Sequence, residues 1–245
     1  MIFRMLLCEW TKLRKSSIWV PVFIAPLLTV LVGMAMSRMD LVTNGNHIAW
    51  LVIYQATIQV YGLLFLPMLA GILASLCCRS EHLAGGWKQL LALPVRRTTV
   101  YAAKFFYVLF FLALAQVLVL FALLVVGLIL HVHAPIPWSM LSKGIIGGWL
   151  ATIPLSALQL WVSTWWKSFG APFALNIILT IPAMSIASSS IYAPLYPWAQ
   201  PVLAMLPRQQ GMLNVTPETM LTMTIAGVIF ILGGWLHFTR RDIQA

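Results

Sequence analysis

Residues 79–104 read Arg-Ser-Glu-His-Leu-Ala-Gly-Gly-Trp-Lys-Gln-Leu-Leu-Ala-Leu-Pro-Val-Arg-Arg-Thr-Thr-Val-Tyr-Ala-Ala-Lys, and this polar segment lies between two long apolar runs. It holds five of the fifteen basic residues of the chain and one of its five acidic residues, Glu81. Because the flanking runs are long enough to cross a bilayer as helices, the segment is predicted to be a loop at one membrane face.

The same segment carries a helical pattern of its own. Leu83, Trp87, Leu90 and Leu91 recur at the spacing that places side chains on one face of a helix. Two adjacent glycines weaken this helix, and Pro94 ends it. The pattern therefore indicates a marginal amphipathic helix. It is either a docking surface for another protein or a helix that only lies on the lipid headgroups.

The composition is typical of a polytopic membrane protein. Of the 245 residues, 61% are hydrophobic and 8% are charged, whereas soluble domains carry about 25% charged residues. The net charge of +10 does not indicate nucleic-acid binding, because no basic patch with interleaved aromatic residues lies outside the apolar runs. The three cysteines, Cys8, Cys77 and Cys78, indicate no disulfide framework.

The apolar runs predict an all-α protein with a single transmembrane domain over residues 1–245. A helix needs about 20 apolar residues to cross a bilayer. Six runs without a single Asp, Glu, Lys or Arg are candidates: about 17–37, 49–77, 105–130, 144–165, 169–188 and 219–239.

Residues 1–16 predict a separate amphipathic helix in the inner membrane interface, since their apolar residues recur at helical spacing. We expect its interfacial residues to be Glu9, Trp10, Lys12 and Arg14. The charges persist as far as Lys15, and the apolar run that follows is too long for a signal peptide. We therefore expect no cleaved leader.

The basic residues predict that both termini, and the segment 79–104, are cytoplasmic. With the N-terminus inside, twelve of the fifteen basic residues lie in inner segments, as the positive-inside rule requires. The inner residues are Arg4, Lys12, Arg14, Lys15, Arg79, Lys88, Arg96, Arg97, Lys104, Lys167, Arg240 and Arg241; the outer residues are Arg38, Lys143 and Arg208.

The connection between the fifth and sixth runs is unusually apolar. Residues 189–218 contain five prolines, and no charged residue occurs from 168 to 207. Such a stretch is either a set of short broken or re-entrant helices packed against the bundle at the outer leaflet, or an aromatic loop resting on headgroups. We favour the first interpretation.

Several chemistries lack the residues that they need. Neither of the two Lys-Ser pairs follows the glycine of a phosphate-binding loop, so we expect no ATPase site in this chain. His131 and His133 do not face one point on a helix, and no acid or cysteine completes a metal site there. The spans contain five amides, which we expect to join helices rather than to bind substrate: Gln55, Gln59, Gln116, Gln159 and Asn176.

These features resemble the ABC-2 type permeases, the membrane subunits of ATP-binding cassette exporters. The loop is similar to that of the lantibiotic-immunity and bacteriocin-export permeases, and the stretches 9–16 and 238–243 are similar to the opening and closing elements of that subfamily. The loop residues that carry the resemblance are Glu81, Gly85, Gly86, Trp87, Lys88, Gln89, Leu90, Leu91, Leu93, Pro94, Val95, Tyr101 and Lys104.

The resemblance implies a mechanism and a set of partners. The loop would contain a coupling helix that docks into a separate ATPase, with Trp87, Leu90 and Leu91 as apolar anchors and Glu81 and Lys88 as polar contacts. Two ATPase copies would hold ATP and Mg, so this chain would carry no catalytic residue, cofactor or metal. Two permeases, identical or homologous, would form the path, roofed by the proline-rich connection.

The predicted function is thus that of a permease in a bacterial inner or plasma membrane. Its substrate would be hydrophobic or amphipathic, and we favour an antimicrobial peptide such as a lantibiotic, whose removal gives immunity. Two other classes stay open: a membrane scaffold or sensor subunit that transports nothing, and a secondary transporter or channel that does not use ATP. The absence of charged residues within the spans argues against an ion-coupled transporter.

Overall fold

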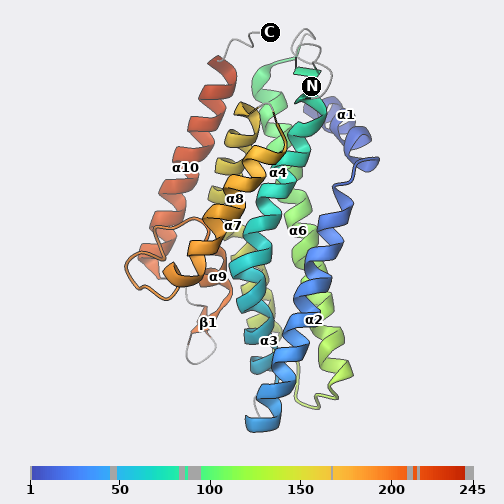
Figure 1. Ribbon diagram of the computed structural model, residues 1–245, viewed down its shortest axis with the longest axis vertical. Coiled ribbons are helices and arrows are strands. Elements are labelled where there is room, and N and C mark those ends of the chain that lie inside the picture. Colours follow the sequence, from blue (N-terminus) through green and yellow to red (C-terminus); the bar gives the residue numbers. More distant parts are fainter. Residues whose placement is uncertain are drawn as a thin grey trace.

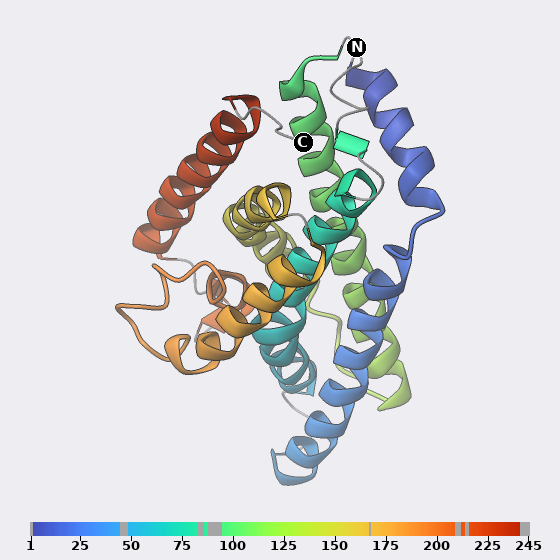
Figure 2. The same cartoon turned by 45° about the horizontal axis from the view of Figure 1, so that its top comes forward.

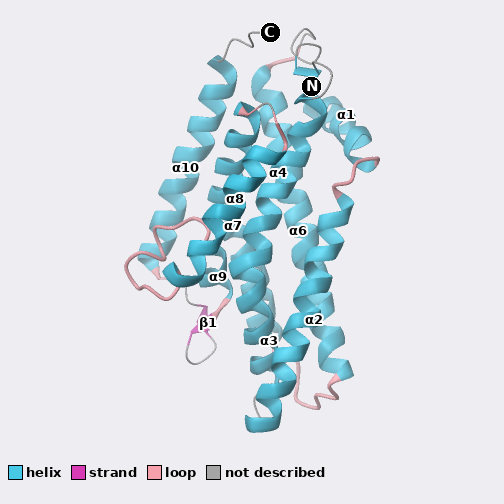
Figure 3. Ribbon diagram, viewed as in Figure 1, coloured by secondary structure: helices cyan, strands magenta, loops and turns pink. Residues whose placement is uncertain are grey.

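A computed structural model describes residues 2–44, 49–82, 86–87, 95–166, 168–208, 212–213 and 216–240. The described chain is a bundle of long helices with one short antiparallel strand pair (Figures 1 and 3). Its elements are α1 (Ile2–Arg14), α2 (Trp19–Asn44), α3 (Ala49–Val60), the π-helix η2 (Tyr61–Phe65), α4 (Leu66–His82), α6 (Arg97–Ile129), α7 (Trp138–Trp165), α8 (Gly170–Ile186), α9 (Gln200–Met205), β1 (Pro207–Arg208), β2 (Met212–Leu213) and α10 (Pro217–Arg240).

Five stretches of the described helices are long and apolar enough to cross a membrane. They are Trp19–Met36, Ala49–His82, Arg97–Ile129, Trp138–Trp165 and Pro217–Arg240. The remaining candidate, α8, has 17 residues and so extends about 26 Å, less than the roughly 30 Å of a hydrocarbon core. The membrane class is therefore supported, and the sixth crossing stays a prediction.

Both helices at the ends of the described chain reach the same end of the bundle. In Figures 1 and 2, α1 and the last turn of α10 lie at the end where α4 stops and α6 starts. The turn between α6 and α7 lies at the opposite end (Figure 1). The segments that were expected to share the cytoplasmic face are thus neighbours in space.

More of the polar segment 79–104 is helical than the sequence predicts. Helix α4 continues to His82 and α6 begins at Arg97, so both ends of the segment belong to long helices. Between them Gly86 and Trp87 are helical, while 83–85 and 88–94, with most of the predicted amphipathic helix, lie outside the described residues. Helix α6 begins before the predicted run 105–130, and its charged Lys104 is paired with two carboxylates.

Helices α3 and α4 follow each other without a gap and form one rod with a π-helical turn, η2, between them. In η2 the chain makes a wider turn, and the Leu66 N–H donates to the Tyr61 carbonyl five residues earlier. Pro67 follows at once and has no N–H to donate. Gly62 in this turn lies so close to α9 that a Cβ would come within 2.8 Å of Val202 Cα.

Asn176 on α8 is the centre of a buried amide cluster. Its Oδ1 accepts hydrogen bonds from Gln159 Nε2 on α7 and from Trp198 Nε1, both at 2.8 Å. Its Nδ2 donates to the Pro67 carbonyl on α4 at 3.0 Å. The prediction that amides join helices is confirmed for Gln159 and Asn176, which attach the short helix α8 to its neighbours.

The other three amides have different surroundings. Gln116 is buried in α6, with no hydrogen-bond partner for either amide atom among the described residues. Gln55 and Gln59 are exposed one helical turn apart on α3, a helix whose other faces are mostly buried. The expectation that these amides join helices is therefore wrong for Gln55 and Gln59 within the described chain.

The proline-rich connection packs against the bundle. After a series of turns it forms α9, whose residues are mostly buried against α7 and η2. The Tyr54 hydroxyl on α3 donates to the Met205 carbonyl at 2.6 Å. A short broken helix packed on the bundle is thus present, and its insertion from the outer leaflet stays a prediction.

Replacing Asn176 by Ala is expected to lower the free energy of unfolding by about 2 kcal/mol, because three buried hydrogen bonds, two of them between helices, are lost. Thermal unfolding in mild detergent measures the change. Ser185→Ala, at an exposed position of the same helix, is the matched control, with an expected change of under about 0.5 kcal/mol. Equal losses for both variants would show that Asn176 does not hold α8.

Candidate functional site

Helix α1 lies across the end of the bundle and turns one charged residue inward. Its buried residues are Met5, Glu9 and Leu13, which recur every four positions and so share one face. Its exposed apolar residues include Ile2, Phe3 and Leu7. The helix predicted for residues 1–16 is present as Ile2–Arg14, and its position in a membrane interface stays a prediction.

Aromatic contacts hold α1 on α2 and α6. The Trp10 ring stacks on Tyr107 with centroids 6.2 Å apart, and it meets the edges of Trp19 and Phe110 at 6.1 and 6.3 Å. The Tyr107 hydroxyl donates to the Leu6 carbonyl at 2.7 Å. Aromatic pairs of this kind stabilise packing beyond the area that they bury, so α1 is a fixed part of the bundle.

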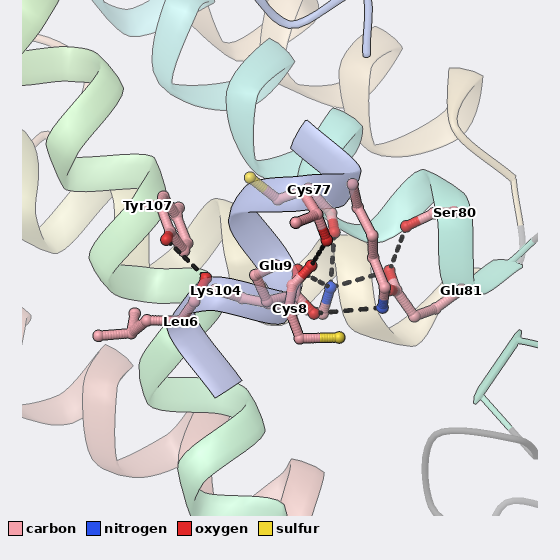
Figure 4. A network of polar contacts seen from close by, with 10 residues as sticks. Leu6, Cys8, Glu9, Cys77, Ser80, Glu81, Lys104 and Tyr107 are labelled. Carbon is pink, nitrogen blue, oxygen red and sulfur yellow. Dashed lines mark hydrogen bonds and ion pairs between the residues drawn. The ribbon is translucent and has the colours of Figure 1, made fainter. Parts of the chain in front are cut away.

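Beneath α1 lies a buried ion cluster formed by Glu9, Lys12, Glu81 and Lys104 (Figure 4). Lys104 Nζ lies 2.8 Å from Glu81 Oε2 and 3.2 Å from Glu9 Oε2. Lys12 Nζ lies 3.0 Å from Glu81 Oε1 and 3.5 Å from Glu9 Oε1. Three of these four ion pairs join α1, α4 and α6 to one another, and the fourth, Lys12–Glu9, lies within α1.

The hydrogen-bonding capacity of Lys104 is fully used. Its ammonium group donates to Glu9, to Glu81 and to the Cys77 carbonyl, the last at 2.7 Å. An ammonium has three N–H donors, and here each has an acceptor. The Ser80 hydroxyl adds a further hydrogen bond to Glu81 at 2.9 Å. Complete pairing explains how Lys104 can be only 1% exposed.

The cluster is electrically neutral, with two carboxylates and two ammonium groups. The side chains of Glu9, Glu81 and Lys104 are at most 2% exposed, whereas that of Lys12 is 35% exposed at the rim. Partial burial alone would lower the pKa of Lys12, but the carboxylates of Glu9 and Glu81 outweigh burial and raise it. Lys12 therefore remains charged at neutral pH and balances the cluster.

Trp87 covers the cluster from the side of the polar segment. Its ring centroid lies 5.6 Å from Lys104 Nζ, within the range of a cation–π contact. Its indole N–H donates to His82 Nδ1 at 3.1 Å, so His82 donates from Nε2 to the Ser163 carbonyl at 2.7 Å. Trp87 also meets the Phe238 ring at 5.4 Å. It thereby connects the polar segment to α4, α6, α7 and α10.

A glycine permits this arrangement. Gly86 lies against the end of α4 so closely that a Cβ would come within 2.9 Å of the Glu81 Cα and of the Ser80 carbonyl. Backbone atoms cannot move aside as a flexible side chain can. Gly86 is therefore what allows Trp87 to reach the cluster.

The structure brings together some of the predicted site residues. Glu9, Lys12 and Glu81 meet in the cluster, and Trp87 packs against it at Lys104. Trp10 instead packs on aromatic rings of α2 and α6. Arg14 is exposed at the end of α1. Lys88, Leu90 and Leu91 lie outside the described residues.

Sequence reasoning missed the pairing itself. The sequence places Lys104 among the inner basic residues and in the resemblance, and it assigns Glu9 and Glu81 to separate surfaces, so it predicts no ion pair among them. A usable signal was present, since the chain has only five acidic residues and Glu81 falls just after the long apolar run 49–77. A charged residue at such a place has a partner in most membrane proteins.

Comparison with known proteins gives one family. Residues 5–183 match the model of the ABC-2 family transporter proteins, a stretch that contains most of α1 and the whole ion cluster. Neither the curated proteins nor the solved structures that were compared with the chain gave a match.

Lys104→Met is expected to lower the free energy of unfolding by about 3–5 kcal/mol, because it leaves two buried carboxylates facing one lysine. Adding Glu81→Gln restores neutrality, so the double variant should be more stable than Lys104→Met alone. Denaturation in detergent gives both values. Lys143→Met, at an exposed lysine of α7, controls for loss of charge, and a double variant as unstable as the sum of its singles would refute the pairing.

Proposed function

The chain belongs to the ABC-2 family of transporter proteins, and from this premise we propose that it exports a hydrophobic or amphipathic substrate across a bacterial plasma membrane. Members of this family are membrane subunits whose ATP is hydrolysed by a separate cassette protein. The favoured substrate is an antimicrobial peptide such as a lantibiotic, as in the subfamily that the polar segment resembles. Both termini and the ion cluster would then be cytoplasmic.

The observation that carries the proposal is the ion cluster at the base of the polar segment. Glu81 lies one residue before the end of α4, and Lys104 lies in the second turn of α6. Lys104 pairs with Glu9 and Glu81 pairs with Lys12, and these two ion pairs fix both helix ends to α1. A displacement of the segment between His82 and Arg97 would therefore be transmitted to two long helices and to α1 together.

The proposed docking surface for the ATPase comprises Glu81, Trp87, Lys88, Leu90 and Leu91. Glu81 is 2% exposed and Trp87 is 9% exposed, so these two side chains would contact the bundle and not the ATPase. They would hold the segment on the bundle, while Lys88, Leu90 and Leu91 would contact the ATPase. Binding to the outer residues would thus pull on a segment that is fastened at its inner side.

We propose further that two copies pair around a path that includes α3. Gln55 and Gln59 are exposed on one face of a helix that is long enough, with α4, to cross the membrane. An amide that faces hydrocarbon is unfavourable, so a polar path or a second permease is the better neighbour. The packed segment around α9 would close that path from the outside.

Docking is tested by co-expressing the chain with its genomic neighbours and measuring the ATPase that is retained in mild detergent. Leu90→Ala with Leu91→Ala is expected to weaken retention about thirtyfold, as for truncated interface anchors. Leu27→Ala with Leu31→Ala, at exposed positions of α2, is the matched control. Equal retention for both pairs would refute the docking surface.

The same preparation separates the competing functions. An exporter should show ATPase activity that a peptide substrate stimulates, whereas a scaffold or sensor subunit should bind the ATPase without stimulation by any peptide. A chain that transports without a bound ATPase would be a secondary transporter.

Gln55→Leu with Gln59→Leu is expected to reduce peptide transport in vesicles at least tenfold, because the polar face of α3 is lost. ATPase retention should not change, since these residues lie far from the polar segment along the α3–α4 rod. The conservative pair Gln55→Asn with Gln59→Asn should keep most of the transport. Full transport by the leucine pair would remove α3 from the path.

A further inference from the structure

Beside the ion cluster, but distinct from it, the structure has a small basic pocket. It is a cavity of about 300 Å³ between the end of α1, the start of α2 and the last turns of α4. Its polar lining residues are Lys12, Lys15, Ser16, Ser17, Arg79 and Ser80. Leu13 and Leu76 complete the wall. No acidic residue is among these lining residues.

The positive charge of the pocket is largely uncompensated. Lys12 is balanced by Glu9 and Glu81 in the cluster. Lys15 and Arg79 are both exposed, and neither makes an ion pair with a carboxylate of the described residues. Arg79 is held in place by its contact with the Phe169 ring, at 5.8 Å from the centroid. The pocket thus presents two available cations to one cavity.

The donors of the pocket fit a phosphate group. An arginine guanidinium binds phosphate oxygens through paired N–H bonds, and a lysine ammonium adds a point charge. Three serine residues supply hydroxyl donors around these cations. Cations and hydroxyls of this kind in one concave site favour an anionic phosphate ester.

The position of the pocket favours a phospholipid over a dissolved phosphate. Helix α2 leads away from the pocket as a membrane-crossing stretch, and its exposed apolar residues include Val20, Phe23, Leu27 and Leu31. A lipid whose phosphate lay in the pocket could lay its acyl chains along these side chains. Basic pockets between helices at a membrane face are the usual sites for anionic headgroups.

We propose that this pocket binds the phosphate group of an anionic phospholipid from the adjoining leaflet. Lys12 belongs both to the pocket and to the ion cluster. A bound phosphate would share Lys12 with Glu81 and hold it at the rim between two anions. The lipid would thereby strengthen the attachment of α1 to the bundle, whether or not the chain exports a peptide.

The test is a titration of the purified, delipidated full chain with phosphatidylglycerol, followed by native mass spectrometry. Wild type should bind one lipid saturably, and Lys15→Gln with Arg79→Gln should weaken binding about thirtyfold. Arg4→Gln with Arg14→Gln is the matched control, since it removes two exposed charges of α1 that do not line the pocket. The control should stay within about threefold of wild type.

Two further arms separate the sources of phosphate and guard against misfolding. Neither phosphatidylcholine nor inorganic phosphate at equal concentration should displace the bound lipid. Lys15→Glu leaves the Arg79–Phe169 contact intact and should still abolish binding. Absence of saturable binding, equal losses in the test and control pairs, or displacement by inorganic phosphate would each overturn the proposal, the last by showing a site for free phosphate.

Discussion

Four charged side chains in a nearly dry site are the constraint on which this end of the protein depends. Glu9, Glu81 and Lys104 are buried, and each is acceptable there only because the others are present. Removing α1 would expose Glu81 and Lys104 to solvent. It would also leave Glu81 without Lys12, one of its two lysine partners. The N-terminal helix is therefore part of the fold, and its place is fixed by charge pairing as much as by the aromatic packing around Trp10.

Several helices that are distant in sequence contact one another around the ion cluster. Trp87 reaches α10 through Phe238 and α7 through His82 and Ser163, while Arg97 at the start of α6 donates to the Thr239 carbonyl on α10 at 3.1 Å. Most contacts of this end thus converge on the two helix ends that flank the polar segment. A displacement of the segment would therefore be transmitted to α4, α6, α7 and α10.

Much of the architecture follows from the sequence, because apolar runs of membrane length and a concentration of charge at 79–104 are local properties. The helical N-terminal stretch was also predictable, as was a helix-joining role for Gln159 and Asn176, although not that they bond to each other. The ends of α4 and α6 were not, because Glu81 and Lys104 become buried only where Lys12 and Glu9, which are distant in sequence, pair with them. The exposure of Gln55 and Gln59 was equally hidden, since one sequence cannot show which face of α3 its neighbours cover.

The π-turn between α3 and α4 has a consequence for how the rod can change. Each residue of an α-helix advances the chain by about 100° around the axis, and a π-turn accommodates one residue more than an α-helical turn. The face that carries Gln55 and Gln59 is therefore offset from the face that it would occupy in an uninterrupted helix. Loss of a single residue within Tyr61–Phe65 would rotate all of α3 relative to α4 and turn both glutamines toward other neighbours. The one extra residue of the π-turn thus determines toward which side of the rod Gln55 and Gln59 face. The ion cluster at the far end of α4 does not depend on this residue.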